Sequence, residues 1–348
     1  MLSSRLLRWY QKNARALPWR ETRDPYKIWI SEVMLQQTTV KAVIPYYLRW
    51  IKTFPTVCHL ARASRQKVLR LWQGLGYYAR AKNLHKSSQI LVKDFSGKIP
   101  QVFEQLRALP GFGPYTTGAV LSIAFNKKHP IIDANVRRVV MRLLAIEGFA
   151  DTKNDEDIFK YLQKILPNKQ VGDFNQALME LGAVVCRSRE PLCGSCPVRQ
   201  HCYAFQKGIQ EIIPKPKKSV IKDVRAVIAV IKRNGKYLIQ KRPSSGLLAD
   251  LWEFPGGKIE KKESAKAALV REVKEELGAD VLTSRFLFDV IHYYTQFRVK
   301  LFVFDCQVKG RIKFHRFQRW VSPKSLSQFP MPSGSARILS KIIDYNIH

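Results

Sequence analysis

Four cysteines close together in the sequence constrain the fold of this chain more than any other feature. Cys186, Cys193, Cys196 and Cys202 lie within 17 residues, with the spacing Cys-x6-Cys-x2-Cys-x5-Cys. Four thiolates at such spacing can surround one tetrahedral centre, and ligation by four cysteines is typical of iron–sulfur clusters and of zinc. The other two cysteines lie far from this stretch and are predicted to be core thiols. The pattern therefore indicates a metal site rather than a disulfide framework.

Charge is the second constraint. Among 348 residues, 60 Lys and Arg outnumber 27 Asp and Glu, which gives a net charge of +33. Residues 1–207 carry 33 basic and 14 acidic side chains, and residues 224–348 carry 23 and 11. A basic excess in both parts is typical of proteins that lie along nucleic acid. No stretch approaches the ~18 apolar residues that span a bilayer, so no membrane span is expected. We also expect a cytoplasmic, nucleoid-associated monomer.

The hydrophobic pattern changes once along the chain. Up to the cysteines, apolar residues follow a helical period interrupted by Pro and Gly. Residues 208–223 include a run rich in proline and lysine and read as a linker. After it, β-branched runs flank Asn234-Gly235, which predicts a hairpin, and a helix is expected near 264–277. The sequence therefore predicts an all-α domain over 1–207 and an α/β domain over 224–348.

Two acidic residues in the first domain are candidates for paired acid–base chemistry. Asp133 precedes a helix expected to begin at Ala134, where it can cap the helix and be kept ionised by the helix dipole. Glu32 lies in an apolar helical segment, where desolvation would raise its pKa. One group would then donate a proton while the other remains an anion, as in the hydrolysis of glycosidic bonds. An ordinary helix cap and a surface glutamate are the alternatives.

Residues 109–118 contain a Gly-x-Gly turn that resembles a helix–hairpin–helix. Its glycines permit close backbone approach, so that N–H groups at a helix start can bind DNA phosphate. A plain helix turn is the alternative. Together with other motifs, this hairpin makes residues 1–207 resemble the MutY family of adenine DNA glycosylases, in the endonuclease III superfamily. The motifs occur in the family's order at residues 17–20, 31–38, 74–80, 109–115, 133–135 and 186–202.

The resemblance implies an all-α helix–hairpin–helix glycosylase domain whose loop 186–202 binds one [4Fe–4S] cluster. Its substrate would be double-stranded DNA with adenine opposite 8-oxoguanine or guanine. Glu32 would protonate adenine N7 and later activate water, and Asp133 would stabilise the sugar cation. Tyr115 and Asn135 would orient these two groups. The residues implied to surround the adenine are Arg15, Trp19, Arg20 and Gln176, and those beside the orphaned base are Gln37 and Tyr77.

One position separates the branches of that superfamily. Glycosylase/lyases carry a lysine two residues after the second hairpin glycine, whereas this chain has Tyr115 there. Tyrosine cannot form a Schiff base, so we expect base removal with weak or no strand cleavage. An endonuclease III-like glycosylase/lyase and a non-catalytic DNA-binding relative are the alternatives for the whole chain. The sequence leaves open whether a sliding clamp or other repair proteins are partners.

Residues 257–279 form an essentially complete Nudix box, in which only Ala279 is smaller than usual. Glu272, Glu275 and Glu276 fall on one helix face and, with Gly256, make a candidate Mg²⁺ site. A solvated helix face is the alternative. The resemblance implies a Nudix α/β sandwich that reads 8-oxoguanine.

Two departures from the family concern this domain. MutY proteins commonly have lost the Nudix box, so a Mg²⁺-dependent 8-oxo-dGTP pyrophosphohydrolase is an alternative or additional activity. Where many bacterial members have Phe-Ser-His, the best alignment here gives Tyr294, Thr295 and Gln296. The resemblance then implies that Tyr294 stacks on 8-oxoguanine and that Thr295 donates a hydrogen bond to it.

Overall fold

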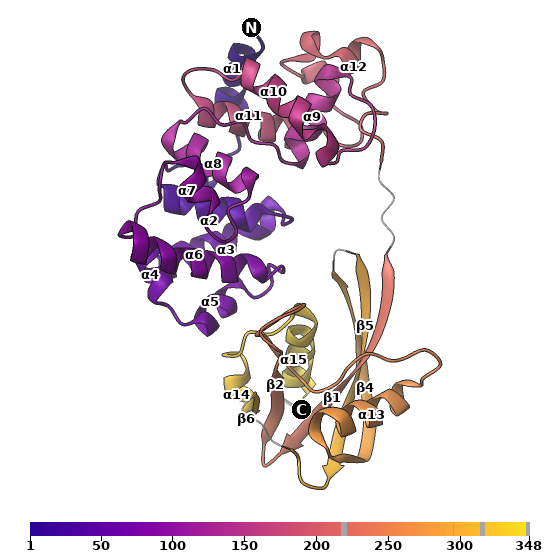
Figure 1. The fold of residues 1–348 in the computed structure, drawn as a ribbon. Coiled ribbons are helices and arrows are strands. Elements are labelled where there is room, and N and C mark those ends of the chain that lie inside the picture. Colours follow the sequence, from indigo (N-terminus) through magenta and orange to yellow (C-terminus); the bar gives the residue numbers. More distant parts are fainter. Residues whose placement is uncertain (217–220, 295, 314–316, 346–348) are drawn as a thin grey trace. The chain divides into compact units, whose positions relative to one another are not determined.

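The structure is a computed structural model that describes the whole chain except residues 217–220, 295, 314–316 and 346–348. The chain forms two units (Figure 1). One consists of Met1–Ala63 and Asn83–Lys218, and the other of Ser64–Lys82 and Ser219–His348. A short segment of the N-terminal half is therefore grouped with the C-terminal residues. The predicted linker at 208–223 stays a prediction.

The first unit is helical, as the period of its sequence predicts. Local signals fix where helices begin. Asp24 accepts hydrogen bonds from the N–H groups of Tyr26 and Lys27, and Pro25 follows it at the first helical position. The helices are α1 (Leu2–Asn13), α2 (Pro25–Leu35), α3 (Val40–Thr53), α4 (Val57–Arg62), α6 (Ala79–Phe95, which begins in the second unit), α7 (Phe103–Arg107), α8 (Pro114–Phe125), α9 (Ala134–Leu144), α10 (Asp155–Ile165), α11 (Val171–Val184) and α12 (Tyr203–Gln206).

One core in this unit joins segments that are distant in the sequence. Apolar side chains of α1 pack with those of α9, α10 and α11, and three of the four clustered cysteines lie against the same core. Ile213, within the predicted linker, is also buried there. This packing fixes the start of α9 relative to the cysteines. In the described part of the chain, no helix is long and apolar enough to cross a membrane.

The second unit contains a mixed six-stranded sheet. Its strands lie in the order β3–β2–β1–β5–β4, and β6 pairs with β2. β1 and β5 are parallel, whereas the other described pairings are antiparallel. Asn234 and Gly235 turn β1 into β2 with φ values of 49° and 71°, as the predicted hairpin requires. The strands are β1 (Lys222–Arg233), β2 (Lys236–Lys241), β3 (Trp252–Glu253), β4 (Asp280–Tyr294), β5 (Phe297–Lys309) and β6 (Gln318–Val321).

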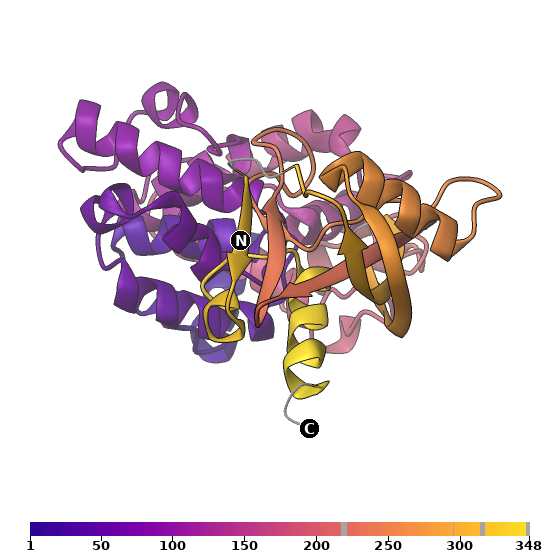
Figure 2. The same cartoon turned by 90° about the horizontal axis from the view of Figure 1, so that it is seen from below.

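Helices cover both faces of this sheet. On one face, Leu269 and Val273 of α13 (Ala265–Leu277) pack against alternate residues of β1. On the other face, Ile338 of α15 (Ser333–Tyr345) packs against the intervening residues. Figure 2 shows the two helices on either side of the strands. The unit has the α/β sandwich that the sequence predicts, and it also contains α5 (Arg65–Trp72) and α14 (Pro323–Leu326).

Candidate functional site

A cavity of about 270 Å³ lies among α2, α8, α9 and α11 in the first unit. Glu32 of α2 and Tyr115 of the first turn of α8 line this cavity. Asp133, the residue that caps α9, lines it as well. Three distant segments of the sequence therefore meet at one cavity. Eight of the predicted site residues line it, namely Arg15, Trp19, Arg20, Glu32, Tyr115, Asp133, Asn135 and Gln176.

The surroundings of Glu32 favour the protonated form of its carboxyl group. Its side chain is buried, and this burial raises its pKa to about 7. The Tyr115 hydroxyl donates a hydrogen bond of 2.5 Å to Glu32 Oε2, which opposes part of that rise by stabilising the carboxylate. The negative charge of Asp133 adds to the rise. At neutral pH a large fraction of Glu32 therefore carries a proton.

Asp133 lies in a more polar setting. Burial raises its pKa above the usual value, while hydrogen bonds to the carboxylate act against this rise. Oδ1 accepts the N–H of Val136 at 2.6 Å, as a helix cap does, and Oδ2 accepts the amide of Asn135 at 3.1 Å. The cap and the inward-facing carboxylate are thus the same group, so both of the roles considered for this residue are geometrically compatible.

Glu180 is a cavity residue that the sequence analysis did not identify. Its buried carboxylate accepts hydrogen bonds from Arg15 Nε at 2.6 Å and from Arg20 Nη2 at 2.7 Å. Burial alone would raise the pKa of Glu180, but these two arginines lower it to about 2. The two cations are therefore held in place by an anion. Glu180 lies one turn after Gln176 on the apolar helix α11, a position that indicates burial but not the two arginines that pair with it.

A hydrogen-bonded path runs along α9 from the cavity toward the clustered cysteines. Arg138 Nη2 donates to Asn135 Oδ1 at 2.8 Å, and Arg138 Nε donates to the carbonyl of Cys186 at 2.9 Å. Because Asn135 donates to Asp133, one side-chain network connects the Asp133 carboxylate to the backbone of the cysteine loop. The orientation of Asp133 thus depends on how that loop is folded.

The four cysteines line one small cavity together with Arg142. Arg142 is almost completely buried, and its guanidinium donates to Cys186 Sγ at 3.3 Å and to the carbonyl of Arg187 at 2.6 Å. Arg142 thus places a buried positive charge beside the cavity that the four cysteines line. Within the described residues, no set of three or more His, Cys, Asp or Glu side chains is positioned around a single metal ion.

The predicted hairpin connects α7 to α8. Gly111 has a φ of +82°, and a Cβ there would meet Cβ of Asn83 at 2.8 Å, so both the turn and the close approach require glycine. Phe112 stacks on Trp29 of α2, with ring centroids 5.0 Å apart. This stacking fixes α2 relative to the hairpin.

Two of the binding residues predicted within residues 1–207 do not line the cavity. Gln37 and Tyr77 are both exposed, and both adopt the left-handed backbone region with φ values of 57° and 43°. Gln37 lies between α2 and α3 in the first unit, whereas Tyr77 lies in the second. An exposed side chain on a backbone in this rarely used region suits contact with a ligand better than a role in the core.

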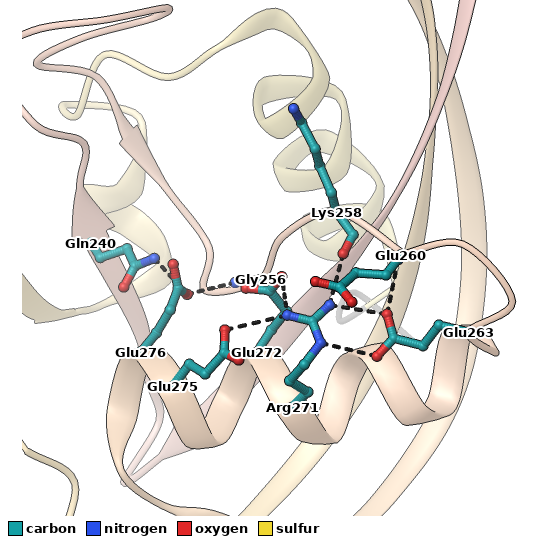
Figure 3. A network of polar contacts seen from close by, with 9 residues as sticks. All are labelled: Gln240, Gly256, Lys258, Glu260, Glu263, Arg271, Glu272, Glu275 and Glu276. Atoms are coloured by element: carbon teal, nitrogen blue, oxygen red, sulfur yellow. Dashed lines mark hydrogen bonds and ion pairs between the residues drawn. The ribbon is translucent and has the colours of Figure 1, made fainter.

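The box residues of the second unit form a polar network on α13 (Figure 3). Glu276 accepts the N–H of Gly256 at 2.9 Å and the amide of Gln240 at 2.7 Å, and burial raises its pKa to about 7. Arg271 holds Glu272 at 2.9 Å and Glu275 at 3.2 Å. All three glutamates are thus oriented by other residues of the box region.

Tyr294, one of the two predicted reader residues, is the last residue of β4. Tyr294 is partly buried, lies edge-on to His292 with ring centroids 4.4 Å apart, and has its pKa raised by burial. Thr295 lies outside the described residues. Tyr293, which was not predicted, is 63% exposed and is the more accessible of the two adjacent aromatic rings.

Two family models match the chain. Residues 30–168 match the HhH-GPD superfamily of base excision DNA repair proteins, and residues 226–341 match the NUDIX domain. The chain is 39% identical to the adenine DNA glycosylase of Buchnera aphidicola subsp. Schizaphis graminum, over 73% of this chain and 74% of that protein. Identity to the Homo sapiens adenine DNA glycosylase is 34%, over 88% of this chain and 67% of the relative.

Among solved structures, a thermostable thymine-DNA glycosylase superposes with a TM-score of 0.54 at 28% identity, covering 59% of this chain and 95% of the other. The fold prediction is thereby confirmed in both parts, a helix–hairpin–helix glycosylase domain followed by a Nudix domain. The chain belongs to the adenine DNA glycosylase family of base-excision repair enzymes, which act on DNA.

Proposed function

We propose that Glu32 and Asp133 together break the bond between adenine N9 and deoxyribose C1′. Glu32 gives its proton to adenine N7, so that the electron pair of the C1′–N9 bond leaves with a neutral base. Asp133 faces the positive charge that develops on the sugar. Water then adds to C1′ and returns a proton to Glu32. The buried, protonatable Glu32 in the same cavity as Asp133 carries this proposal.

The test is Glu32→Gln in the full-length chain. Glutamine keeps the shape of the side chain but has no proton to give, so single-turnover excision should fall at least about a hundredfold while DNA affinity stays within a few fold. Excision at the wild-type rate would refute the proposal. Tyr26→Phe on the same helix, away from the cavity, is the control for general effects on α2.

The opposing base and the absence of strand cleavage are further parts of the proposal. Tyr115 donates to Glu32 and offers no amine for a Schiff base, which favours hydrolysis without β-elimination. Duplexes with adenine opposite 8-oxoguanine, guanine, thymine or cytosine should be processed in the first two cases. Strand breaks should appear only after alkali treatment. Breaks without alkali would instead support the glycosylase/lyase alternative.

We also propose that the four clustered cysteines hold one [4Fe–4S] cluster. They line a common cavity, and the buried Arg142 guanidinium beside Cys186 would balance part of the negative charge of a cluster held by four thiolates. Such a cluster would supply a rigid centre on which loop 186–202 folds. The path through Arg138 would then carry that rigidity to Asp133. Iron and sulfide content of the purified protein, with visible absorption, tests this assignment; zinc in their place would overturn it.

For the C-terminal domain we propose recognition of 8-oxoguanine, with the end of β4 as the reading edge. Hydrolysis of oxidised nucleoside triphosphates is a second candidate, favoured by the oriented glutamates of the box. Their carboxylate oxygens are the donors Mg²⁺ prefers, and the ion would neutralise a bound diphosphate. Within the described residues these groups do not surround a single ion position. Mg²⁺-dependent pyrophosphate release from 8-oxo-dGTP, lost in Glu275→Gln, would establish the second activity; release unaffected by that change would reject it.

A further inference from the structure

The loop that carries Tyr77 in the second unit has an unusual backbone. Residues 74–77 follow α5, and Gly74, Gly76 and Tyr77 have φ values of 104°, 69° and 43°. A residue with a Cβ adopts this region only where its surroundings hold it there. Tyr77 is nevertheless 43% exposed. The constraint must therefore come from the residues around the loop.

Hydrogen bonds from neighbouring side chains hold the backbone of residues 74–77. The Trp72 indole N–H donates to the carbonyl of Gly76 at 2.9 Å, and Arg80 donates to the carbonyl of Leu75 at 2.9 Å. The Arg80 guanidinium also lies 5.7 Å from the centre of the Tyr77 ring and 5.1 Å from that of Trp72. One arginine thus connects the ring, the loop backbone and the end of α5.

The two residues that flank the loop, Gln73 and Tyr78, both form hydrogen bonds with one residue of the C-terminal part, Met331. The N–H of Met331 donates to Gln73 Oε1 at 3.1 Å, and the Tyr78 hydroxyl donates to the carbonyl of Met331 at 2.9 Å. Met331 is completely buried in the core on one face of the sheet. The preceding carbonyl, of Pro330, accepts the N–H of Trp252 in β3. The loop is therefore clamped at both ends to a rigid point of the sandwich.

A buried carboxylate holds the outer ends of the same segment. Asp250 is 3% exposed and lies 3.2 Å from Arg65, at the start of α5, and 2.9 Å from Lys82, in the first turn of α6. Lys241 of β2 approaches it at 3.4 Å. Arg65 and Lys82 thus pair both ends of residues 65–82 with one buried anion, which Lys241 connects to β2.

We propose that the C-terminal domain positions Tyr77, with Gln73, Tyr78 and Asp250 as positioning residues for opening the base stack. This inference rests on the proposed adenine glycosylase function and on the role that the family resemblance implies for Tyr77, entry into the stack beside the orphaned base. A side chain already fixed in its working orientation loses less conformational entropy on entering DNA than a mobile one. The domain thereby promotes base flipping through the tyrosine loop, apart from any contact that it makes with 8-oxoguanine.

The test uses Tyr78→Phe in the full-length chain, which removes one hydroxyl and keeps the ring. The probe is a duplex with adenine opposite 8-oxoguanine and a fluorescent base analogue beside the 8-oxoguanine, so that unstacking raises its emission. We expect a smaller fluorescence rise on binding and a single-turnover excision rate about two- to tenfold lower. Asp250→Asn should act in the same direction, and Asp250→Glu should recover part of the signal.

Two controls separate positioning from folding. Tyr26→Phe removes a matched bond in the first unit, from a buried phenol to the carbonyl of Phe54 at 2.8 Å. It should lower the melting temperature without changing the fluorescence. In the double variant Tyr77→Ala/Tyr78→Phe, the second change should add nothing to the first, because both act through one ring.

The outcomes distinguish this inference from the function on which it rests. If Tyr77→Ala leaves the fluorescence rise intact, the proposed insertion of Tyr77 fails. If Tyr77→Ala abolishes the rise while Tyr78→Phe and Asp250→Asn behave as wild type, only the positioning role fails. Fully additive effects in the double variant would also overturn the positioning role.

Discussion

Glu32 and Tyr115 form a pair in which one side chain tunes the other. Burial raises the pKa of Glu32 to about 7, and the Tyr115 hydrogen bond holds it below what burial alone would give. Excision should therefore decline as pH rises through about 7, where the proton is lost. Tyr115→Phe should move that midpoint to higher pH while lowering the maximal rate. Single-turnover rates from about pH 5 to about pH 9 measure it; an unchanged or lower midpoint would contradict the pairing.

Glu180 matters for stability as well as for the cavity. Its pKa is lowered to about 2, so its ion pairs stabilise the fold above the ordinary glutamate pKa and are lost as pH falls toward 2. Glu180→Gln leaves Arg15 and Arg20 without their anion and should cost about 2–3 kcal/mol at neutral pH. Urea unfolding at neutral and acidic pH checks this. A variant whose deficit persists undiminished in acid would point to packing instead of charge.

At the scale of helices and strands, the sequence predicts the features that residues close together in the chain determine, such as helix starts and turns. The helix after Asp133 begins at Ala134 with that aspartate as its cap, and Asn234-Gly235 makes the expected turn. The parallel pairing of β1 with β5 and the grouping of residues 64–82 with the sandwich were not predicted. Both depend on side chains that are far apart in the sequence, and no local period or cap reports them.

In the candidate site, too, contacts between residues distant in the sequence could not be predicted. The two carboxylates and most of the cavity lining could be chosen from motifs, but Glu180 could not. Its role is defined by Arg15 and Arg20, which lie 165 and 160 residues away. An acid in an apolar helix signals burial, but its partners emerge only when α11 packs in three dimensions. Long-range pairing of charges is thus the part of the site that the sequence leaves open.

The crossing of α9 and α11 provides a test at this scale. A Cβ on Gly182 would meet Cβ of Asn135 at 2.6 Å and its backbone at 3.1 Å, so α9 would have to shift. Gly182→Ala should destabilise the protein by about 1–3 kcal/mol. It should also slow excision more than it weakens DNA binding, because Asn135 orients Asp133. Glu156→Ala, at a position of α10 whose side chain is 79% exposed, is the control. Equal effects of the two changes would contradict the crossing argument.

For the whole molecule, charge and chemistry should respond differently to salt. A net charge of +33 draws the protein to DNA, and each phosphate neutralised releases counterions, so affinity should fall linearly on a logarithmic salt scale. With about six to ten phosphate contacts, the loss between about 50 and 200 mM salt would be about 10³- to 10⁵-fold. However, Glu32 is buried and Asp133 is partly buried, and salt screens such charges weakly.

Single-turnover excision at saturating enzyme should therefore change by less than about threefold over the same range, once every duplex is bound. Binding to a duplex that contains an uncleavable adenosine analogue gives the first quantity, and rapid-quench excision gives the second. If the rate of excision fell in parallel with DNA affinity, salt would have to screen the charges of Glu32 and Asp133 as strongly as it screens the surface cations. Glu32 would then not be shielded from solvent, and a pKa near 7 for Glu32 would lose its physical cause, because that value depends on burial.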